Sequence, residues 1–299
     1  MSNLYAQLLH KISQKIRSKQ PKLKTNILSD EYHINYAIKN QYGTKLKYGF
    51  PYDIENKEIV EIGCGHGGIS LFLAVNGAKH VTGIDLNTHD LDIAHKAKKI
   101  IEKRLNMEAI GLPVTFKEMN AYSLVFPENS VDLIIADNVF EHFMEPKKVM
   151  DECYRVLKPG GYLLVPTFNS IYSKHGPHLK YGLGIPWAYC IASEKTLIKA
   201  VKLNANKDAT IYDAYPKLNI ENNKLNKIRA YEDLNYITHR KFKQIAKEAN
   251  FKIQSFWVSP PFSNYFVNNL MRPILNNKRV STSRISDVLS KNAGALLVK

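Results

Sequence analysis

The feature that most constrains the fold is a regular alternation of two kinds of segment between residues 58 and 167. Short apolar runs of strand length alternate with longer segments in which apolar residues recur at helical spacing. Such an alternation is typical of a parallel sheet covered by helices on both faces, because each buried strand is followed by a crossover helix. The segments that predict strands are 58–63, 80–85, 113–119, 131–137 and 161–167, and those that predict helices are 67–76, 88–105 and 146–156.

The alternation stops after this region and resumes near the C-terminus. A helix is predicted over 238–249, and strands are predicted over 251–258 and 294–298. With these segments the expected fold class is α/β: a Rossmann-like, seven-stranded, mostly parallel sheet with helices on both faces.

The domain organisation follows from where the alternation is absent. Residues 168–236 are rich in Tyr, Asn, Lys, Gly and Pro and hold one predicted helix, in the run SEKTLIKAVKL. We therefore expect one domain over 57–299, interrupted at about 168–236 by an insertion that caps the substrate at the active edge of the sheet. Residues 1–56 are expected to form an N-terminal helical extension with an aromatic approach loop.

The first 24 residues predict a basic amphipathic helix that ends before Pro21. This segment contains six Lys and Arg residues and no acidic one, and apolar residues recur every four positions, at Leu4, Leu8, Ile12 and Ile16. Two interpretations are open. The apolar row can dock on the body of the domain, or the helix can contact an anionic membrane surface or a partner.

The net charge of +15 indicates attraction to polyanions or anionic surfaces, without saying which. No window approaches the roughly 20 apolar residues of a membrane-spanning helix, and the N-terminus lacks a secretory signal, so a cytoplasmic protein is expected, with peripheral contact at the inner face of a membrane as an option. The three cysteines are far apart and form no C-x-x-C pair, which indicates neither a disulfide framework nor a zinc site.

The run IVEIGCGHGGIS, residues 59–70, predicts a ligand-binding turn after the first strand. Its glycines allow a backbone to approach a ligand closely, at the edge where open α/β sheets bind ligands. Glu61 argues against a dinucleotide, because a carboxylate beside this turn would repel a pyrophosphate. A cofactor with an ammonium or sulfonium group and no phosphate is favoured instead.

The same residues, VEIGCGHG, resemble the first motif of class I S-adenosylmethionine-dependent methyltransferases, an acidic residue followed by alternating glycines. The run VLKPGGYLLV resembles that family's Lys/Arg-Pro-Gly-Gly turn before the fifth strand. The resemblance covers roughly residues 55–170 and the C-terminal pair of strands. It implies S-adenosyl-L-methionine as the cofactor, bound in part by Glu61 and by the turn residues Gly63, Cys64, Gly65 and Gly67.

Further cofactor contacts are implied at the ends of the next strands. Asp85 ends the second strand, where a carboxylate can accept hydrogen bonds from both ribose hydroxyls, and Leu86 is placed to pack on the adenine. Asn120 and Ala121 stand where the family has an acidic residue and alanine, and an amide oxygen can still accept from the adenine amino group. Asn138 begins the run NVFEH, which resembles the segment flanking the methyl donor.

His142, in this NVFEH run, is the first candidate for a general base, because an imidazole titrates near neutral pH. In the insertion, His175 and His178 are also candidate site residues. With neighbouring aromatic residues they would line a substrate cavity or pack as a lid. A metal site is not predicted there, because no acidic or cysteine ligand accompanies the two histidines.

Three functions remain open on the sequence. The favoured one is methylation, at oxygen, of a small-molecule or glycan acceptor, motivated by the aromatic insertion. The second is an RNA methyltransferase, motivated by the charge, although ADNVFEHF stands where amino-directed nucleic-acid enzymes of this fold often carry Asn/Asp-Pro-Pro-Tyr/Phe. The third is a catalytically silent scaffold attached to a membrane through residues 1–24.

Overall fold

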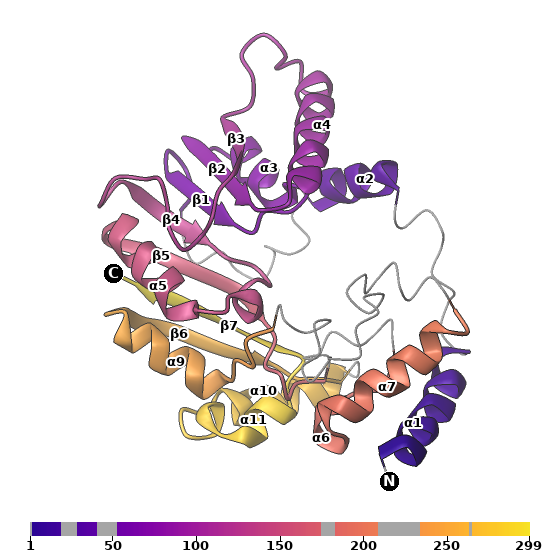
Figure 1. Ribbon diagram of the computed structural model, residues 1–299. Coiled ribbons are helices and arrows are strands. Elements are labelled where there is room, and N and C mark those ends of the chain that lie inside the picture. Colours follow the sequence, from indigo (N-terminus) through magenta and orange to yellow (C-terminus); the bar gives the residue numbers. More distant parts are fainter. Residues whose placement is uncertain (1, 19–28, 41–52, 175–182, 209–233, 263–264) are drawn as a thin grey trace.

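The centre of the protein is a seven-stranded sheet with the strand order β3-β2-β1-β4-β5-β7-β6 (Figure 1). The computed structural model describes residues 2–18, 29–40, 53–174, 183–208, 234–262 and 265–299. The strands are β1 (Glu58–Ile62), β2 (His80–Asp85), β3 (Val114–Glu118), β4 (Val131–Ile135), β5 (Leu157–Phe168), β6 (Lys252–Ser259) and β7 (Asn292–Val298).

The pairing confirms the predicted fold class. The pairs among β1 to β5 are parallel, and β7 runs antiparallel between β5 and β6. Strand order reverses at the β1–β4 pair, where Ile59 lies opposite Leu133. In an open sheet of this kind, ligands bind outside the carboxyl ends of the strands at this reversal.

Helices cover both faces because alternate strand residues point to opposite sides. Val60 and Ile62 belong to the core beneath α5 and α9, whereas Ile59 belongs to the core beneath α2, α3 and α4. The helices are α1 (Ser2–Arg17), α2 (Asp30–Asn40), α3 (Gly68–Val75), α4 (Thr88–Arg104), α5 (Pro146–Val156), α6 (Ala188–Ile191), α7 (Glu194–Ala205), α9 (His239–Glu248), α10 (Tyr265–Asn276) and α11 (Arg284–Val288), with the short 3-10 helices η3 (Phe140–His142) and η6 (Val280–Thr282).

The Lys-Pro-Gly-Gly turn lies inside β5 rather than before it. Leu157 already pairs with Val131, and the register then shifts so that Tyr162 pairs with Leu133. Gly160, in the loop created by this shift, has φ +76°, a conformation that L side chains rarely adopt. The prediction that this turn reverses the chain was wrong. Helix α5 ends at Val156, β5 begins at Leu157, and the strand runs parallel to β4 on both sides of the glycines, so Lys-Pro-Gly-Gly forms an irregularity within the strand.

Helix α1 docks on α7 through a face other than the predicted one. The predicted row is exposed at Leu4, Leu8 and Ile12. The buried side carries Ala6 and Leu9, which join the apolar cluster around α7, and Ser13, whose hydroxyl donates to the Leu183 carbonyl at 2.6 Å. Helix α1 therefore does dock on the body of the protein, but the interpretation that it docks through the row from Leu4 to Ile16 was wrong.

The partner of this docking face is Asn204 of α7, which is fully buried. Its Nδ2 donates to the Ser13 hydroxyl at 2.7 Å, and its Oδ1 accepts from Gln14 Nε2 at 2.9 Å. Arg17 adds an ion pair with Asp208 at 2.7 Å. These contacts fix α1 against α7 at the lower end of the molecule in Figure 1.

None of the helices in the described ranges is both long and apolar enough to cross a bilayer. Most of the predicted aromatic approach loop, residues 41–52, and much of the insertion, residues 175–182 and 209–233, lie outside the described part of the chain. The division into an extension, a domain and an insertion therefore stays a prediction.

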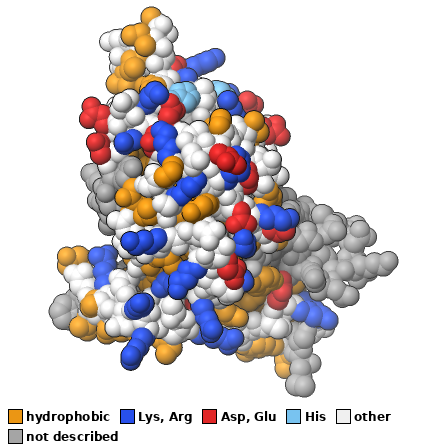
Figure 2. Space-filling view, turned by 90° about the vertical axis from the view of Figure 1, so that its left-hand side faces the viewer, with side chains coloured by type: hydrophobic (Ala, Val, Ile, Leu, Met, Phe, Trp, Pro, Cys, Tyr) orange, Lys and Arg blue, Asp and Glu red, His pale blue; other side chains and the backbone are white. Residues whose placement is uncertain are grey.

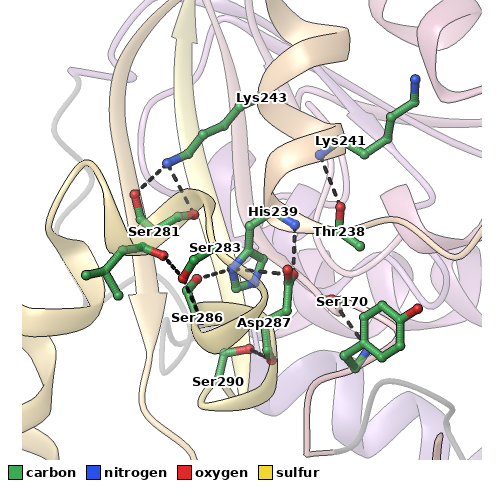
Figure 3. A network of polar contacts seen from close by, with 12 residues as sticks. Ser170, Thr238, His239, Lys241, Lys243, Ser281, Ser283, Ser286, Asp287 and Ser290 are labelled. Atoms are coloured by element: carbon green, nitrogen blue, oxygen red, sulfur yellow. Dashed lines mark hydrogen bonds and ion pairs between the residues drawn. The ribbon is translucent and has the colours of Figure 1, made fainter. Parts of the chain in front are cut away.

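A buried polar network joins the start of α9 to α11 (Figure 3). The His239 ring lies 2.6 Å from the Ser286 hydroxyl through Nδ1, and its backbone N–H donates to Asp287 at 2.9 Å. Its Nε2 has no hydrogen-bond partner among the described residues. Burial, together with the nearby positive charge of Lys243, lowers the pKa of His239 to about 3. Burial raises the pKa of Asp287.

This network predicts a loss of stability in mild acid. Below pH 6.5 the unfolded chain binds a proton at His239 that the folded chain resists down to about pH 3, so the unfolding free energy falls as pH falls through this window. Asp287 offsets part of the loss. Because its pKa is raised, the folded chain binds a proton at this carboxylate at a higher pH than the unfolded chain does. Between pH 6.5 and 5, we expect the wild type to lose roughly 2 kcal/mol more than His239→Gln, measured by urea unfolding. Equal losses in the two proteins would contradict this assignment.

Candidate functional site

The glycine turn between β1 and α3 is built from left-handed backbone. Gly63, Gly65 and Gly67 have φ of +69°, +48° and +77°, in the region that favours glycine. Gly67 is the N-cap of α3 and is bonded through its N–H to the Cys64 carbonyl at 2.9 Å. The alternating glycines of the sequence are therefore required by the path of the chain from the strand into the helix.

The N–H groups of Gly63, Cys64, Gly65 and Gly67 donate within the protein. Those of Gly63 and Cys64 both donate to the Ile84 carbonyl, at 2.8 and 3.0 Å. That of Gly65 donates to Asp85 Oδ2 at 2.9 Å. A pyrophosphate needs such donors. Because these are taken, one of them by a carboxylate, the turn is poorly suited to a dinucleotide.

The space around the three glycines differs. A Cβ on Gly63 would lie 2.4 Å from Val139 Cγ1, and one on Gly67 would lie 2.6 Å from Phe116 Cζ. A Cβ on Gly65 would meet no atom within 4 Å. Gly65 is therefore the point at which the turn faces open space and a ligand can approach its backbone.

Glu61 is buried beneath the turn, and its Oε2 accepts a hydrogen bond from Ser70 of α3 at 2.5 Å. Cys64 is buried as well, and burial, reinforced by the negative charge of Glu61, raises the pKa of its thiol. The structure thus gives Glu61 a role in tying β1 to α3. A direct contact of Glu61 or Cys64 with a cofactor stays a prediction.

The predicted ribose-binding residue, Asp85, lies beside the turn. Its Oδ2 accepts from Gly65, and its Oδ1 accepts from the Asn87 N–H at 3.0 Å. Leu86 follows with 63% of its surface exposed, as a side chain that packs on a ligand would be before binding. The carboxylate therefore holds the turn in place and remains at the open edge of the sheet.

The end of β3 lies next to this carboxylate, since the Met119 N–H donates to the Asp85 carbonyl at 3.1 Å. Asn120 is exposed, and its Oδ1 accepts from the Tyr122 N–H at 2.9 Å. Ala121 is buried. The structure thus brings the predicted adenine-binding pair beside the predicted ribose-binding residue, with the amide oxygen of Asn120 already fixing its own loop.

The loop after β4 forms the other side of the site. Asn138 has φ +58°, and its Oδ1 accepts from Asn169 Nδ2 at 2.8 Å. The same Asn169 amide donates to the buried Glu141 at 2.7 Å. Asn169, directly after β5, was not singled out from the sequence, because no motif signals which loop residues pair across neighbouring strand ends.

His142 lies at the end of η3 and is half-buried, with its backbone N–H bonded to the Val139 carbonyl at 2.9 Å. Val139 in turn packs against Gly63, so the loop carrying His142 contacts the glycine turn. His175 and His178 lie outside the described residues. Within the described ranges, no three His, Cys, Asp or Glu side chains are grouped as metal ligands.

His66 is a further residue that the sequence did not point to. Its Nε2 lies 3.1 Å from Asp90 of α4, and this hydrogen bond lowers the pKa of Asp90. Its ring lies 4.2 Å from the ring of His33 in α2, measured between centroids. The turn is therefore held from two helices that flank it.

The described site gathers negative charge on a protein whose net charge is +15. Asp85, Asp137 and Glu141 follow or end β2 and β4 at the carboxyl edge of the sheet, and Asp137 accepts from the Thr167 hydroxyl at 2.6 Å. Carboxylates at a partly enclosed edge favour a cationic ligand. The arrangement suits a cofactor that carries positive charge and no phosphate.

Residues 60–165 match a family described as "Methyltransferase domain". Over 118 residues the chain is 30% identical to a ubiquinone biosynthesis O-methyltransferase from Photorhabdus laumondii, which covers 39% of this chain and 45% of that protein. A protein of the same name from Cupriavidus pinatubonensis is 33% identical over 117 residues, covering 39% and 43%. The chain therefore matches less than half the length of these relatives.

Among solved structures, an S-adenosylmethionine dependent methyltransferase from Mesorhizobium loti superposes with a TM-score of 0.51. The match covers 87% of this chain and all of that one, at 14% sequence identity. At this identity the likeness concerns the fold. It extends the similarity beyond the matched domain to most of the chain, including the part that follows β5.

Proposed function

Residues 60–165 form a class I S-adenosylmethionine-dependent methyltransferase domain, and from this we propose that the protein methylates an oxygen of a small-molecule acceptor. The names of the relatives, which are O-methyltransferases of ubiquinone biosynthesis, support an acceptor hydroxyl. A glycan hydroxyl is compatible with the same chemistry.

The observation that carries the proposal is how the glycine turn uses its hydrogen-bond donors and where it leaves open space. The N–H groups of its three alternating glycines and of Cys64 donate within the protein, one of them to Asp85, and the space at Gly65 is open. A nucleoside with a sulfonium and an ammonium group fits these residues, because it needs carboxylates and room rather than phosphate donors.

Different residues of the site have different roles in the in-line displacement of the methyl group. When bound, S-adenosyl-L-methionine supplies an electrophilic methyl group. Asp85 would accept hydrogen bonds from the ribose hydroxyls, and Asn120 with Leu86 would position the adenine. The loop after β4 would align the acceptor. His142 would take the proton of the hydroxyl as the oxygen–carbon bond forms and the sulfur–carbon bond breaks, with S-adenosylhomocysteine as the leaving group.

The proposal is tested by product formation. We expect S-adenosylhomocysteine to accumulate when the protein is given S-adenosylmethionine and a panel of hydroxylated aromatic compounds and sugars. The same assay with RNA oligonucleotides tests the second candidate function. Turnover confined to RNA and lost at high salt would overturn the small-molecule assignment. Binding of the cofactor without turnover on any acceptor would favour the silent scaffold.

His142→Gln tests the proposed base. We expect kcat on the best acceptor to fall by about 10²- to 10⁴-fold, because the hydroxyl loses its proton acceptor, while the Kd for S-adenosylmethionine stays unchanged. His80→Gln is the matched control, since His80 begins β2 at the opposite edge of the sheet. A kcat for His142→Gln within about two-fold of the control would give His142 a merely structural role.

A further inference from the structure

Exposed aliphatic and basic side chains lie on α1, α6, α10 and α11, the helices along the lower end of the molecule in Figure 1. The aliphatic ones come from segments far apart in the sequence. We call the exposed surface of these helices the basal face; its exposed aliphatic residues are Leu4, Leu8, Ile12, Ile191, Leu270, Ile274 and Ile285.

Hydrogen bonds join α1 to α6 and α6 to α11, and α10 and α11 both contact the short helix η6 between them. The Tyr5 hydroxyl of α1 donates to the Ile191 carbonyl at the end of α6, at 2.6 Å. At the start of α6, Trp187 Nε1 donates to the Val288 carbonyl of α11, also at 2.6 Å. Helix α6 thus bridges the N-terminal helix to α11.

The exposed aliphatic residues of α1 and α10 form rows with the spacing typical of a helix that lies at a membrane interface. In α1, Leu4, Leu8 and Ile12 follow one another at four-residue spacing, and Leu4 is 75% exposed. In α10, Leu270 and Ile274 have the same spacing. Aliphatic rows of this kind insert into the boundary between lipid headgroups and acyl chains when basic residues flank them.

The charge around these rows is almost entirely positive. In α1, α6 and residues 265–291 the acidic residue is Asp287, which is buried. The basic residues of these segments are Lys11, Lys15, Arg17, Arg272, Lys278, Arg279, Arg284 and Lys291. Arg17 is neutralised by Asp208, and the others leave a positive surface. Figure 2 presents the side of the molecule that is on the left in Figure 1, and there too Lys and Arg side chains lie among hydrophobic ones in the lower part.

We propose that the basal face docks the protein on an anionic lipid bilayer. Both parts of the surface fit this partner: the cations attract lipid phosphates, and the aliphatic side chains enter the headgroup region. RNA would use the cations, but these aliphatic side chains cannot stack on bases. The proposal does not depend on which acceptor is methylated.

Vesicle flotation of the full chain tests the proposal. We expect binding to vesicles of equal parts phosphatidylcholine and phosphatidylglycerol, and little to phosphatidylcholine alone. Leu8→Asp combined with Ile274→Asp should weaken binding to the anionic vesicles by about ten-fold or more. Lys11→Gln combined with Arg279→Gln should weaken it by about five-fold for each charge removed.

The matched control is Ile110→Asp, because Ile110 is 88% exposed in the connection between α4 and β3, at the upper end of the molecule in Figure 1. It should bind anionic vesicles as the wild type does. Circular dichroism shows whether each variant is folded. Failure of the folded wild type to float with anionic vesicles overturns the proposal, as does equal floating of the Leu8→Asp, Ile274→Asp variant. Binding of an oligoribonucleotide that only the Lys11→Gln, Arg279→Gln pair weakens, without vesicle binding, assigns the face to RNA instead.

Discussion

Asp85→Ala is expected to weaken the binding of S-adenosylmethionine by about a hundred-fold or more. The variant would lose the two hydrogen bonds that the carboxylate accepts from ribose hydroxyls. Hydrogen bonds to a charged group contribute about 1.5–3 kcal/mol each, so losing two weakens binding by at least about a hundred-fold. The change also frees the Gly65 N–H, which loosens the turn itself. Calorimetry with the cofactor measures the affinity, and thermal unfolding measures the stability of the same sample.

Asp132→Ala separates the two roles of Asp85. Asp132, in β4, also accepts a backbone N–H from a neighbouring strand, that of Glu58 at 2.9 Å, but it lies at the opposite edge of the sheet. We expect this control to lose stability while keeping its affinity for the cofactor. Unchanged affinity in folded Asp85→Ala would show that this carboxylate serves the turn alone. NAD is expected not to bind the wild type, because the carboxylates of Glu61 and Asp85 beside the turn disfavour a pyrophosphate.

The sheet could be predicted from sequence because its determinants are local. Buried parallel strands such as β1 and β4 are mostly apolar runs, and turn residues such as Gly63 and Asn138, both with positive φ, follow them within a few positions. The glycines of the turn are likewise imposed by three positive φ angles in five residues. Order along the chain and the crossover rule then define the arrangement of the strands.

The docking of α1 could not be predicted in this way. Periodicity shows that a helix has an apolar row, but the buried face depends on a partner distant in the sequence. Here Asn204 provides buried hydrogen-bond groups for Ser13 and Gln14, and leaving such groups unpaired costs about 1–3 kcal/mol each. The same face also buries Leu9 against the apolar cluster of α7, whereas Leu4 and Leu8 remain exposed.

The candidate site also combines features that the sequence could predict with features that it could not. Motif spacing placed Asp85, Asn120 and Asn138 at strand ends, and the structure brings all three to one edge. It did not reveal that Glu61 is engaged by Ser70 or that Asn169 links Asn138 to Glu141. Pairings between loops depend on side-chain geometry, which a single sequence does not encode in a readable pattern.

Gly67→Ala is expected to lower the unfolding free energy by roughly 2–5 kcal/mol. A residue with a side chain in left-handed backbone costs about 1–2 kcal/mol, and forcing an extra carbon into a packed site costs about 1–3 more. Both terms apply here: φ is +77°, and the new Cβ would lie 2.6 Å from Phe116 and 2.9 Å from Ala94. Urea unfolding at neutral pH measures the change.

Gly160→Ala isolates the packing contribution, because Gly160 has nearly the same backbone conformation, φ +76°, and a Cβ there would meet no atom within 4 Å. This variant should lose only the conformational part, about 1–2 kcal/mol. The difference between the two variants then measures how tightly Phe116 closes the turn from below. If Gly67→Ala and Gly160→Ala lose the same unfolding free energy, the Phe116 side chain moves aside without a measurable cost. The close contact beneath Gly67 would then not be what keeps the turn rigid.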